Sequence, residues 1–389
     1  MLFQRNNKIQ NDWSHNHFES HPSNILDECG VFNNRIGISI SFIRIRDGFM
    51  DKSQYIFNLE NEIKSQGYGE YYTAKCIRYA SRLLDNNLPV IFDTKHLALL
   101  IGISAEDLVK MIYCQDLFYK KAYIPKKSGA YRELDMPCLE LKYIQRWILI
   151  NILYNMKVSK YATGFCEKKS ILDNAKLHLN KHCIVNMDVE DFFPSVSFES
   201  IFRIFVYYGY TKEVAWVLTK LCSYDGRLPQ GSPASPCISN IVCLKLDARL
   251  AALAQKYESQ YSRYADDITF SGDNDIKSII KAAVHIINNE GFRVNDRKTR
   301  IAYPHQRQEV TGLLVNGDKI RVSKKYKKEL SQELYYCIKY GVKSHMQHIE
   351  CNKAFYKEHI YGKIYFVNMV EPEEAKKFFE LAKAIEWDY

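Results

Sequence analysis

The fold of this protein is decided by one stretch of the chain, Ser262-Arg263-Tyr264-Ala265-Asp266-Asp267-Ile268-Thr269-Phe270. Two adjacent carboxylates stand between two short runs of apolar and β-branched residues, a pattern that favours a β-hairpin with both acids at its turn. Adjacent negative charges repel, and a buried carboxylate without a partner is unstable, so divalent cations with oxygen ligands would explain the pair. The alternative is an ordinary surface turn, where aspartate is common.

Two upstream segments favour the metal-binding interpretation. Residues 183–195 form a second apolar strand pattern that ends in the acid Asp188, and Leu228-Pro229-Gln230-Gly231 lies between the two strand patterns. If the strands are neighbours, Asp188, Asp266 and Asp267 can hold two Mg²⁺ ions about 3.5–4 Å apart, a geometry that suits phosphoryl transfer.

In order and spacing, these segments resemble the palm of reverse transcriptases, with its first-aspartate strand, LPQG segment and YxDD hairpin. Four further segments are similar to those of the bacterial retron type. They are the NAxxH segment at 174–178, the VTG segment at 310–312, a first conserved block at 134–153, and Gly164-Phe165 followed by Ser170-Ile171. The resemblance covers about residues 80–340.

The resemblance implies an α+β right-hand polymerase fold. The fingers would occupy residues 76–180, the palm 181–322 with an antiparallel sheet and the YADD hairpin, and a helical, basic thumb 323–389. An N-terminal extension over 1–75 would precede the matched core. Long helical patterns alternating with hairpin patterns agree with this class. Hydrophobic periodicity predicts helices at 53–85, twice within 92–118, and at 138–156, 168–180, 198–208, 211–223, 234–257 and 275–290. It predicts strands at 36–46, 183–189, 260–265, 268–272, 292–295, 299–303, 310–315 and 318–322, and a hairpin at 124–132.

The resemblance also implies roles for single residues. Asp188 and Asp266 would bridge two Mg²⁺ ions, Asp267 would be the third acid, and Val189 would offer its backbone carbonyl as a ligand. Phe193 would be the bulky ring that excludes a ribose 2′-hydroxyl and so selects deoxynucleotides, the alternative being a core aromatic beside Pro194.

The incoming nucleotide would be held by residues from three segments. Gln230 and Gly231 would pack against the nucleotide and template. Lys127 and Arg132 would clamp the triphosphate, with Lys126 an equal candidate for Lys127. Lys298 resembles the lysine that protonates departing pyrophosphate, although a surface lysine is the alternative.

Asn174 and His178 lie in the NAxxH segment and are candidates for RNA contact. A hydrogen-bonded structural role is the alternative for His178, and a zinc site is excluded because no second His or Cys stands at ligand spacing.

The net charge of +9 is concentrated near the C-terminus. Residues 297–363 contain 15 Lys and Arg against 6 Asp and Glu. This segment interleaves cations with tyrosines, a combination that can contact phosphates and stack on bases. We therefore expect RNA binding there, unless the segment is only a solvated basic helix face. The candidate contacts are Lys324, Lys325, Lys327 and Lys328.

Composition indicates a large enzyme rather than a disordered or membrane-spanning chain. Hydrophobic residues make up 47% of the 389 residues, and no apolar run of about 18 residues is present. The N-terminus lacks the apolar region of a signal peptide, so we expect a cytoplasmic protein without a membrane partner. The eleven cysteines contain no CxxC pair and are expected to be reduced and mostly buried.

The expected activity is RNA-directed DNA polymerisation. For the retron type, the resemblance implies a cognate structured non-coding RNA, dNTPs, priming from a guanosine 2′-hydroxyl, a branched RNA–DNA product, and an effector or toxin protein in antiphage defence. Group II intron and diversity-generating reverse transcriptases are alternatives, which the NAxxH and VTG segments disfavour. A scaffold that only sequesters RNA or a toxin is disfavoured because it would not need three clustered acids.

Overall fold

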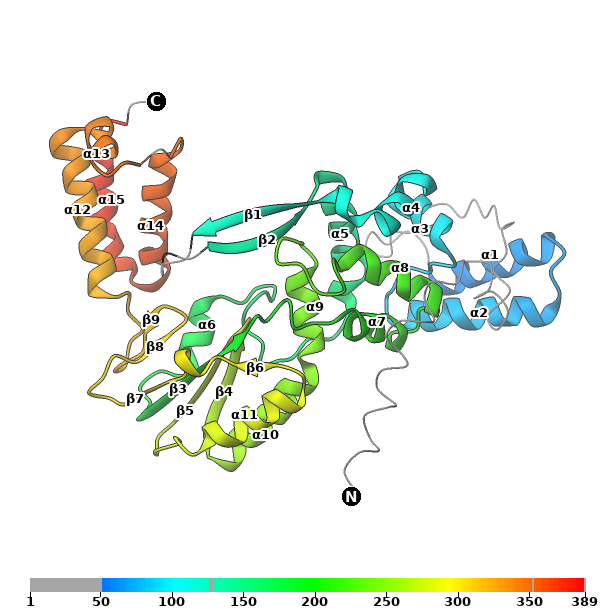
Figure 1. Cartoon of the computed structure of the whole chain (residues 1–389), viewed down its shortest axis with the longest axis horizontal. Coiled ribbons are helices and arrows are strands. Elements are labelled where there is room, and N and C mark those ends of the chain that lie inside the picture. Colours follow the sequence, from blue (N-terminus) through cyan, green and yellow to red (C-terminus); the bar gives the residue numbers. More distant parts are fainter. Residues whose placement is uncertain (1–50, 126–128, 130, 352, 388–389) are drawn as a thin grey trace, which may run out of the picture. The chain divides into compact units, whose positions relative to one another are not determined.

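The computed structural model describes residues 51–125, 129, 131–351 and 353–387, which divide after Ala105 into two compact units (Figure 1). The described part of the first unit contains α1 (Lys52–Ser65), α2 (Glu70–Asp85) and α3 (Thr94–Ile101). The single helical stretch predicted over 53–85 is wrong in one respect, because the chain turns at Gly67, with φ of 80°, between α1 and α2. The strand predicted at 36–46 lies outside the described residues.

The second unit begins with helices and a long hairpin. After α4 (Ala105–Tyr113) and the 3₁₀ turn η2 (Gln115–Phe118), β1 (Tyr119–Pro125) pairs antiparallel with β2 (Tyr131–Pro137). The hairpin predicted around Gly129 is therefore confirmed and is longer than expected. It continues into α5 (Leu139–Asn151), η3 (Leu153–Asn155) and α6 (Ile171–Lys176). The helix predicted over 168–180 is reduced to α6, which begins at a capping box formed by Ser170 and Asp173.

A five-stranded sheet occupies the centre of this unit. The strand order is β4 (Ser259–Tyr264), β5 (Asp267–Gly272), β3 (Cys183–Glu190) and β6 (Arg293–Val294), and β7 (Arg300–Ala302) also pairs with β3. All pairings are antiparallel. The prediction of antiparallel strands in a mixed helix and sheet fold is confirmed. Because Ile184, Met187, Ile268 and Phe270 are buried, the sheet carries part of the core.

Helices cover this sheet and extend the unit. They are α7 (Phe198–Tyr207), α8 (Lys212–Cys222), α9 (Ser235–Val242), α10 (Leu244–Lys256), α11 (Ile279–Asn289) and the 3₁₀ turn η4 (Asp296–Lys298). In Figure 1, α10 and α11 lie along the sheet, and α10 contacts β4. The helix predicted over 234–257 is interrupted at Cys243, where α9 ends and α10 begins.

The segment after β7 differs from the predicted strands. Instead of one strand over 310–315, β8 (Glu309–Val310) and β9 (Leu313–Leu314) form a tight hairpin. Its two loop residues, Thr311 and Gly312, both have positive φ, 46° and 84°. The strand predicted over 318–322 is absent from the described structure apart from an isolated bridge between Leu314 and Arg321.

The C-terminal segment is helical, as predicted, with α12 (Lys324–Tyr340), α13 (Val342–His348), α14 (Tyr356–Val370) and α15 (Pro372–Lys383). Leu330, Leu334, Ile360 and Val367 belong to its apolar core, which continues to Ile184 of β3. All ten cysteines in the described ranges are free, and six of them are buried. Within the same ranges, no helix is both long and apolar enough to cross a membrane.

Candidate active site

Three acids meet at one end of the central sheet. Asp188 on β3 is the cross-strand partner of Asp267, the first residue of β5. Asp266 stands in the two-residue loop between β4 and β5, and its carbonyl oxygen accepts a hydrogen bond of 3.0 Å from the backbone N–H of Val189. Like charges directly opposite each other destabilise a sheet, so this placement calls for a compensating positive charge.

The electrostatics of the acids agree with their proximity. Burial raises the pKa of Asp266, and the negative charge of Asp188 raises it further, whereas Lys298 and Arg132 act in the opposite direction. The Asp267 side chain stays accessible to solvent, but the surrounding protein desolvates it. Together with the charges of Asp266 and Asp188, this desolvation raises the pKa of Asp267 to about 6.

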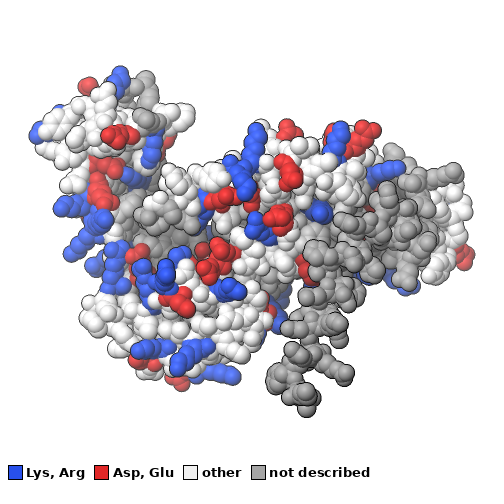
Figure 2. Space-filling view, viewed as in Figure 1, with Lys and Arg blue, Asp and Glu red and all other residues white. Residues whose placement is uncertain are grey.

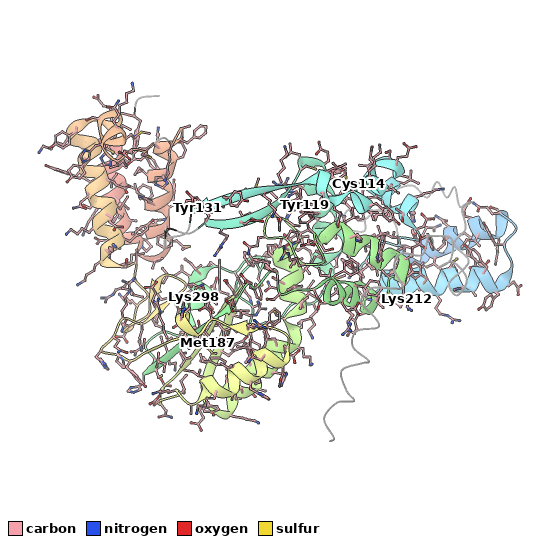
Figure 3. All side chains as sticks on the ribbon, viewed as in Figure 1. Cys114, Tyr119, Tyr131, Met187, Lys212 and Lys298 are labelled. Carbon is pink, nitrogen blue, oxygen red and sulfur yellow. The ribbon has the colours of Figure 1, made fainter. Side chains whose placement is uncertain are left out.

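Lys298 is held against Asp188. Its Nζ donates hydrogen bonds of 2.8 and 2.9 Å to the two carboxylate oxygens of Asp188. The backbone N–H of Asn295 donates to the carbonyl of Asp188 at 2.8 Å, which fixes η4 beside β3. Figure 3 shows Lys298 close to Met187, the residue before Asp188. Lys298 is therefore paired with one of the three acids, and its role in the reaction stays a prediction.

The donor chemistry of these residues fits divalent metal. Three carboxylates with a backbone carbonyl nearby are the hard oxygen ligands that Mg²⁺ takes. As the side chains stand in the described ranges, no three His, Cys, Asp or Glu residues surround one cation position. In this arrangement both carboxylate oxygens of Asp188 accept hydrogen bonds from Lys298.

An aromatic group borders the acids. The ring of Phe193 lies 6.1 Å from that of Phe165 and 5.5 Å from that of Phe192. Phe165 also approaches Tyr264, with ring centroids 6.3 Å apart. Phe192 is buried, whereas Phe193 is only partly buried.

The segments expected to hold a nucleotide lie against each other. The backbone N–H of Gly231 donates to the carbonyl of Asp135 on β2 at 3.2 Å, which joins the LPQG segment to the β1–β2 hairpin. Arg132 is exposed on the same strand, and its charge acts on Asp266. Tyr131, its neighbour, is labelled near the tip of this hairpin in Figure 3. Lys127 and Lys126 lie outside the described residues.

Asn174 and His178 form a buried network, which corrects the expectation that they contact RNA. The two ring nitrogens of His178 lie 2.7 Å from the hydroxyl oxygens of Ser262 and Ser271. The Ser262 hydroxyl also donates to the side-chain oxygen of Asn174 at 2.6 Å. Asn174 and His178 are 1% and 0% exposed, so RNA cannot reach them. Their role is to fasten the segment around α6 to β4 and β5.

The four candidate lysines of α12 separate into two kinds. Lys324, Lys325 and Lys328 are exposed, and Figure 2 shows Lys and Arg side chains gathered over this end of α12. Lys327 is partly buried, and its Nζ donates to both carboxylate oxygens of Glu371, at 3.0 and 3.2 Å. Lys327 is therefore corrected from an RNA-binding candidate to a structural residue that links α12 to the start of α15.

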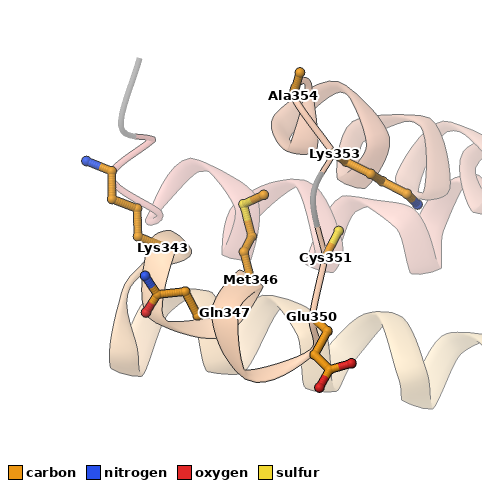
Figure 4. A pocket seen from close by; sticks show the side chains of 7 residues that line it. All are labelled: Lys343, Met346, Gln347, Glu350, Cys351, Lys353 and Ala354. Carbon is orange, nitrogen blue, oxygen red and sulfur yellow. The ribbon is translucent and has the colours of Figure 1, made fainter.

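A pocket in the C-terminal helices contains none of the predicted site residues (Figure 4). It lies between the end of α13 and the segment leading to α14. Its lining residues are Lys343, Met346, Gln347, Glu350, Cys351, Lys353 and Ala354. The pocket is therefore not part of the acid cluster.

Sequence reasoning missed two charged residues next to the cluster. Arg263 on β4 and Asp247 on α10 are completely buried and paired with each other. A signal was present, because Arg263 shares one face of its strand with Tyr261. Asp247 shares one face of its helix with the apolar Leu250 and Ala251, three and four residues later. A charged residue at an inward-facing position needs a buried partner.

Comparisons with known proteins show which family this sequence is similar to. Residues 124–329, more than half of the chain, match the family model described as reverse transcriptase (RNA-dependent DNA polymerase). The chain is 34% identical over 313 residues to the retron Ec86 reverse transcriptase of Escherichia coli, an alignment that covers 79% of this chain and 94% of that protein. It is 33% identical over 274 residues to the retron Mx65 reverse transcriptase of Myxococcus xanthus, covering 65% and 62%. A structure of telomerase from Candida albicans with a fragment of telomeric RNA aligns with a TM-score of 0.40 and 12% identity, covering 69% and 61%.

Proposed function

This chain belongs to the retron-type reverse transcriptases and is an RNA-directed DNA polymerase, and on that premise we propose that it copies part of its own structured non-coding RNA into single-stranded DNA. RNA is its template, and its family uses divalent metal ions. The observation that carries the proposed mechanism is the pairing of Asp188 with Asp267 across β3 and β5, with Asp266 in the loop that precedes β5.

We assign the metal site to these three acids, with the carbonyl of Val189 as a further ligand. Two Mg²⁺ ions, when bound, would supply the positive charge that stabilises the attacking and leaving oxygens. The protein contributes the positions of the carboxylates. Asp188 and Asp267 are set by the β3–β5 register, and Asp266 is set by its hydrogen bond to β3.

The nucleotide would lie between the acids and the β1–β2 hairpin. Arg132 would bind the triphosphate, as would Lys127, while Gln230 and Gly231 would pack against the base pair being formed. Phe193 would press on the sugar and exclude a 2′-hydroxyl. Lys298 would deliver a proton to pyrophosphate, since its ammonium already lies within hydrogen-bond distance of Asp188.

The parts of the chain take the roles of a right-hand polymerase in this proposal. Residues 76–180 form the fingers, 181–322 the palm, and 323–389 a thumb that binds RNA through exposed cations and aromatics. Tyr335 and Tyr340 are 52% and 56% exposed, and Lys339 lies over both rings. Such a surface can contact phosphates and stack on bases.

The product would be a branched RNA–DNA molecule primed from a guanosine 2′-hydroxyl, within an antiphage system that includes an effector protein. Sequencing the nucleic acid that copurifies with the protein tests this part of the proposal. We expect DNA joined to a guanosine of one structured RNA. Linear host RNA alone would contradict the retron product while leaving polymerase activity intact.

The metal site is tested by replacing Asp266 and Asp267 with Ala. Removing two ligands should lower primer extension on an RNA template by more than about a thousandfold, the scale on which loss of one preorganised electrostatic group already acts. Folding and RNA binding should persist. The matched control is Asp273→Ala, an exposed acid just after β5 that pairs with Lys181. Extension by the double variant at the control's rate would refute the assignment.

A further inference from the structure

A buried ion pair lies next to the turn that carries Asp266. The Nε and Nη2 atoms of Arg263 donate to the two carboxylate oxygens of Asp247 at 2.7 and 2.8 Å. Both side chains are 0% exposed. Burying two charges is costly, and an apolar pair of similar volume is often equally stable, so stability alone does not explain this pair.

Arg263 makes a further contact that an apolar residue could not replace. Its Nη1 donates to the carbonyl oxygen of Ala265 at 3.1 Å and to the side-chain oxygen of Asn240 at 3.1 Å. Ala265 is the first residue of the β4–β5 loop and has φ of 57°, a backbone conformation that alanine rarely adopts. The guanidinium thus holds the carbonyl of a strained residue immediately before Asp266.

The backbone around this loop is fixed from two other directions. The N–H of Val189 donates to the carbonyl of Asp266 at 3.0 Å. Gly164 packs so closely that a Cβ on it would lie 2.8 Å from the nitrogen of Ala265, and Asn240 Nδ2 donates to the carbonyl of Gly164 at 2.9 Å. Arg263 and Gly164 therefore share Asn240 as a support, and the loop has little freedom to change its conformation.

We propose that the Arg263–Asp247 pair is a positioning device that sets the direction of the Asp266 carboxylate. The inference rests on the proposed function, in which Asp266 is a metal ligand. Arg263 is a positioning residue, because its side chain is enclosed by protein and reaches the acid cluster only indirectly, by way of the Ala265 carbonyl, the Asn240 side chain and the Phe192 ring. Without it, the strained loop can relax, and a displacement of about 1 Å at a reacting group can cost about a hundredfold in rate.

The main test replaces both partners at once, Arg263→Met with Asp247→Leu, so that no unpaired charge is left buried. The double variant should melt at a lower temperature than wild type, because Tyr261 and Asn240 each lose a buried hydrogen-bond partner, but at a higher temperature than Asp247→Leu alone, which leaves the Arg263 charge unpaired. Its affinity for Mn²⁺ alone, measured from the spin-resonance signal of free Mn²⁺, should fall at least about tenfold. Its kcat should fall about 10- to 100-fold with the KM for primer–template unchanged.

Two single variants separate positioning from general stability. Arg263→Lys keeps a buried cation but cannot form the same fork to Asp247 and also reach Ala265, so Mn²⁺ affinity should fall as in the double variant. Tyr261→Phe removes the 2.7 Å hydrogen bond from the Tyr261 hydroxyl to Asp247 without touching the loop. It should lower the melting temperature and leave Mn²⁺ affinity and kcat unchanged.

The outcomes distinguish the inference from the function on which it rests. If folded Arg263→Lys or the double variant binds Mn²⁺ and turns over like wild type, the pair is only structural and the inference fails. If Asp266→Ala itself leaves Mn²⁺ affinity unchanged, the proposed metal site fails, whatever Arg263 does. A Tyr261→Phe variant that loses Mn²⁺ affinity as strongly as Arg263→Lys would also overturn the positioning role, because the effect would then follow stability.

Discussion

At the scale of single residues, several side chains occupy positions that are unfavourable for stability. Asp188 and Asp267 are like charges on opposite strand positions. Ala265 and Phe165 have positive φ of 57° and 58°, which a glycine would adopt more easily. These residues all lie within or beside the acid cluster. Positive φ also occurs at described residues far along the chain, such as Thr311, so it is the coincidence of backbone strain with opposed carboxylates that is typical of a functional site.

The Phe193 ring should control sugar selection. Phe193→Val would leave space for a 2′-hydroxyl, so the preference for a deoxynucleotide over the matching ribonucleotide should fall at least about tenfold, the scale set by small changes of pocket volume. The ratio of kcat/KM for dNTP and rNTP measures this. Phe202→Val, a ring on α7, is the control and should keep the wild-type ratio. An unchanged ratio for Phe193→Val would identify this ring as core packing.

His178 should make the fold sensitive to acid. Burial lowers the pKa of His178 to about 3, with the charge of Lys181 acting in the same direction, whereas a histidine in the unfolded chain titrates near 6.5. At pH values between these two pKa values, His178 is protonated in the unfolded chain and neutral in the folded protein. The stabilisation is therefore complete above about pH 6.5 and declines as the pH falls toward 3.

The free energy of unfolding should thus lose about 2 kcal/mol to His178 between pH 7 and pH 5. Asn at this position cannot take up the proton. His178→Asn should be less stable at pH 7, because it loses a hydrogen bond to a serine, but its free energy of unfolding should change less with pH. Denaturant unfolding of both proteins at the two pH values measures the difference. Equal pH slopes would show that another group accounts for any acid sensitivity.

At the scale of elements, close backbone contacts join segments that are distant in sequence. The LPQG loop meets β2 at Gly231, and the β4–β5 loop meets Gly164. The β8–β9 hairpin depends on Thr311 and Gly312, both with positive φ. These contacts explain why glycine stands at positions 164, 231 and 312, which the sequence shows only as members of motifs.

Gly231→Ala should disturb the contact between the LPQG loop and β2. A Cβ at this position would lie 2.5 Å from the carbonyl oxygen of Asp135, so the backbone must shift. Stability should fall by about 1–3 kcal/mol, and the KM for dNTP should rise because Gln230 moves with the loop. Gly362→Ala on α14 meets nothing within 4 Å and should keep or raise the melting temperature. An unchanged KM for Gly231→Ala would separate this contact from nucleotide binding.

At the scale of the whole molecule, positive charge is unevenly distributed. The segment 297–363 carries the excess of Lys and Arg, whereas the cations of α15 are paired at three-residue spacing with Glu373, Glu374 and Glu380. Counterion release on RNA binding should therefore depend on the first group and not on the second.

Replacing Lys324, Lys325 and Lys328 with Gln should weaken RNA binding and reduce its dependence on salt. Each lost phosphate contact should lower the slope of log K against log salt by about 0.7–0.9. Extension at saturating template should recover, since the acids are untouched. Replacing Lys376, Lys377 and Lys383 is the matched control with the same number of charges. Lys327 is left unchanged because its loss would leave the Glu371 carboxylate with no ion-pair partner and only its hydrogen bond from the backbone N–H of Val322. Equal slopes in both triple variants would show that the α12 lysines face solvent and do not contact RNA phosphates.

The sequence alone determined the order of the strands and helices around the acids, because hydrophobic periodicity and turn residues act over a few neighbouring positions. It predicted the β4–β5 hairpin, β3 and the helical C-terminal segment. It also brought Asp188, Asp266 and Asp267 together through their likeness to one family. Element ends were less accurate: Gly67, Cys243 and Thr311 interrupt stretches whose patterns run continuously.

Only the tertiary structure decided which polar residues face inward. Asn174, His178 and Lys327 look in sequence like residues available to RNA, yet each is engaged by partners from distant segments: Ser262 and Ser271 for the first two, Glu371 for the third. Arg263 and Asp247 are sixteen residues apart and belong to different elements, so no local pattern pairs them. Local periodicity can indicate that a residue faces inward, but which side chains become partners is decided by packing between segments.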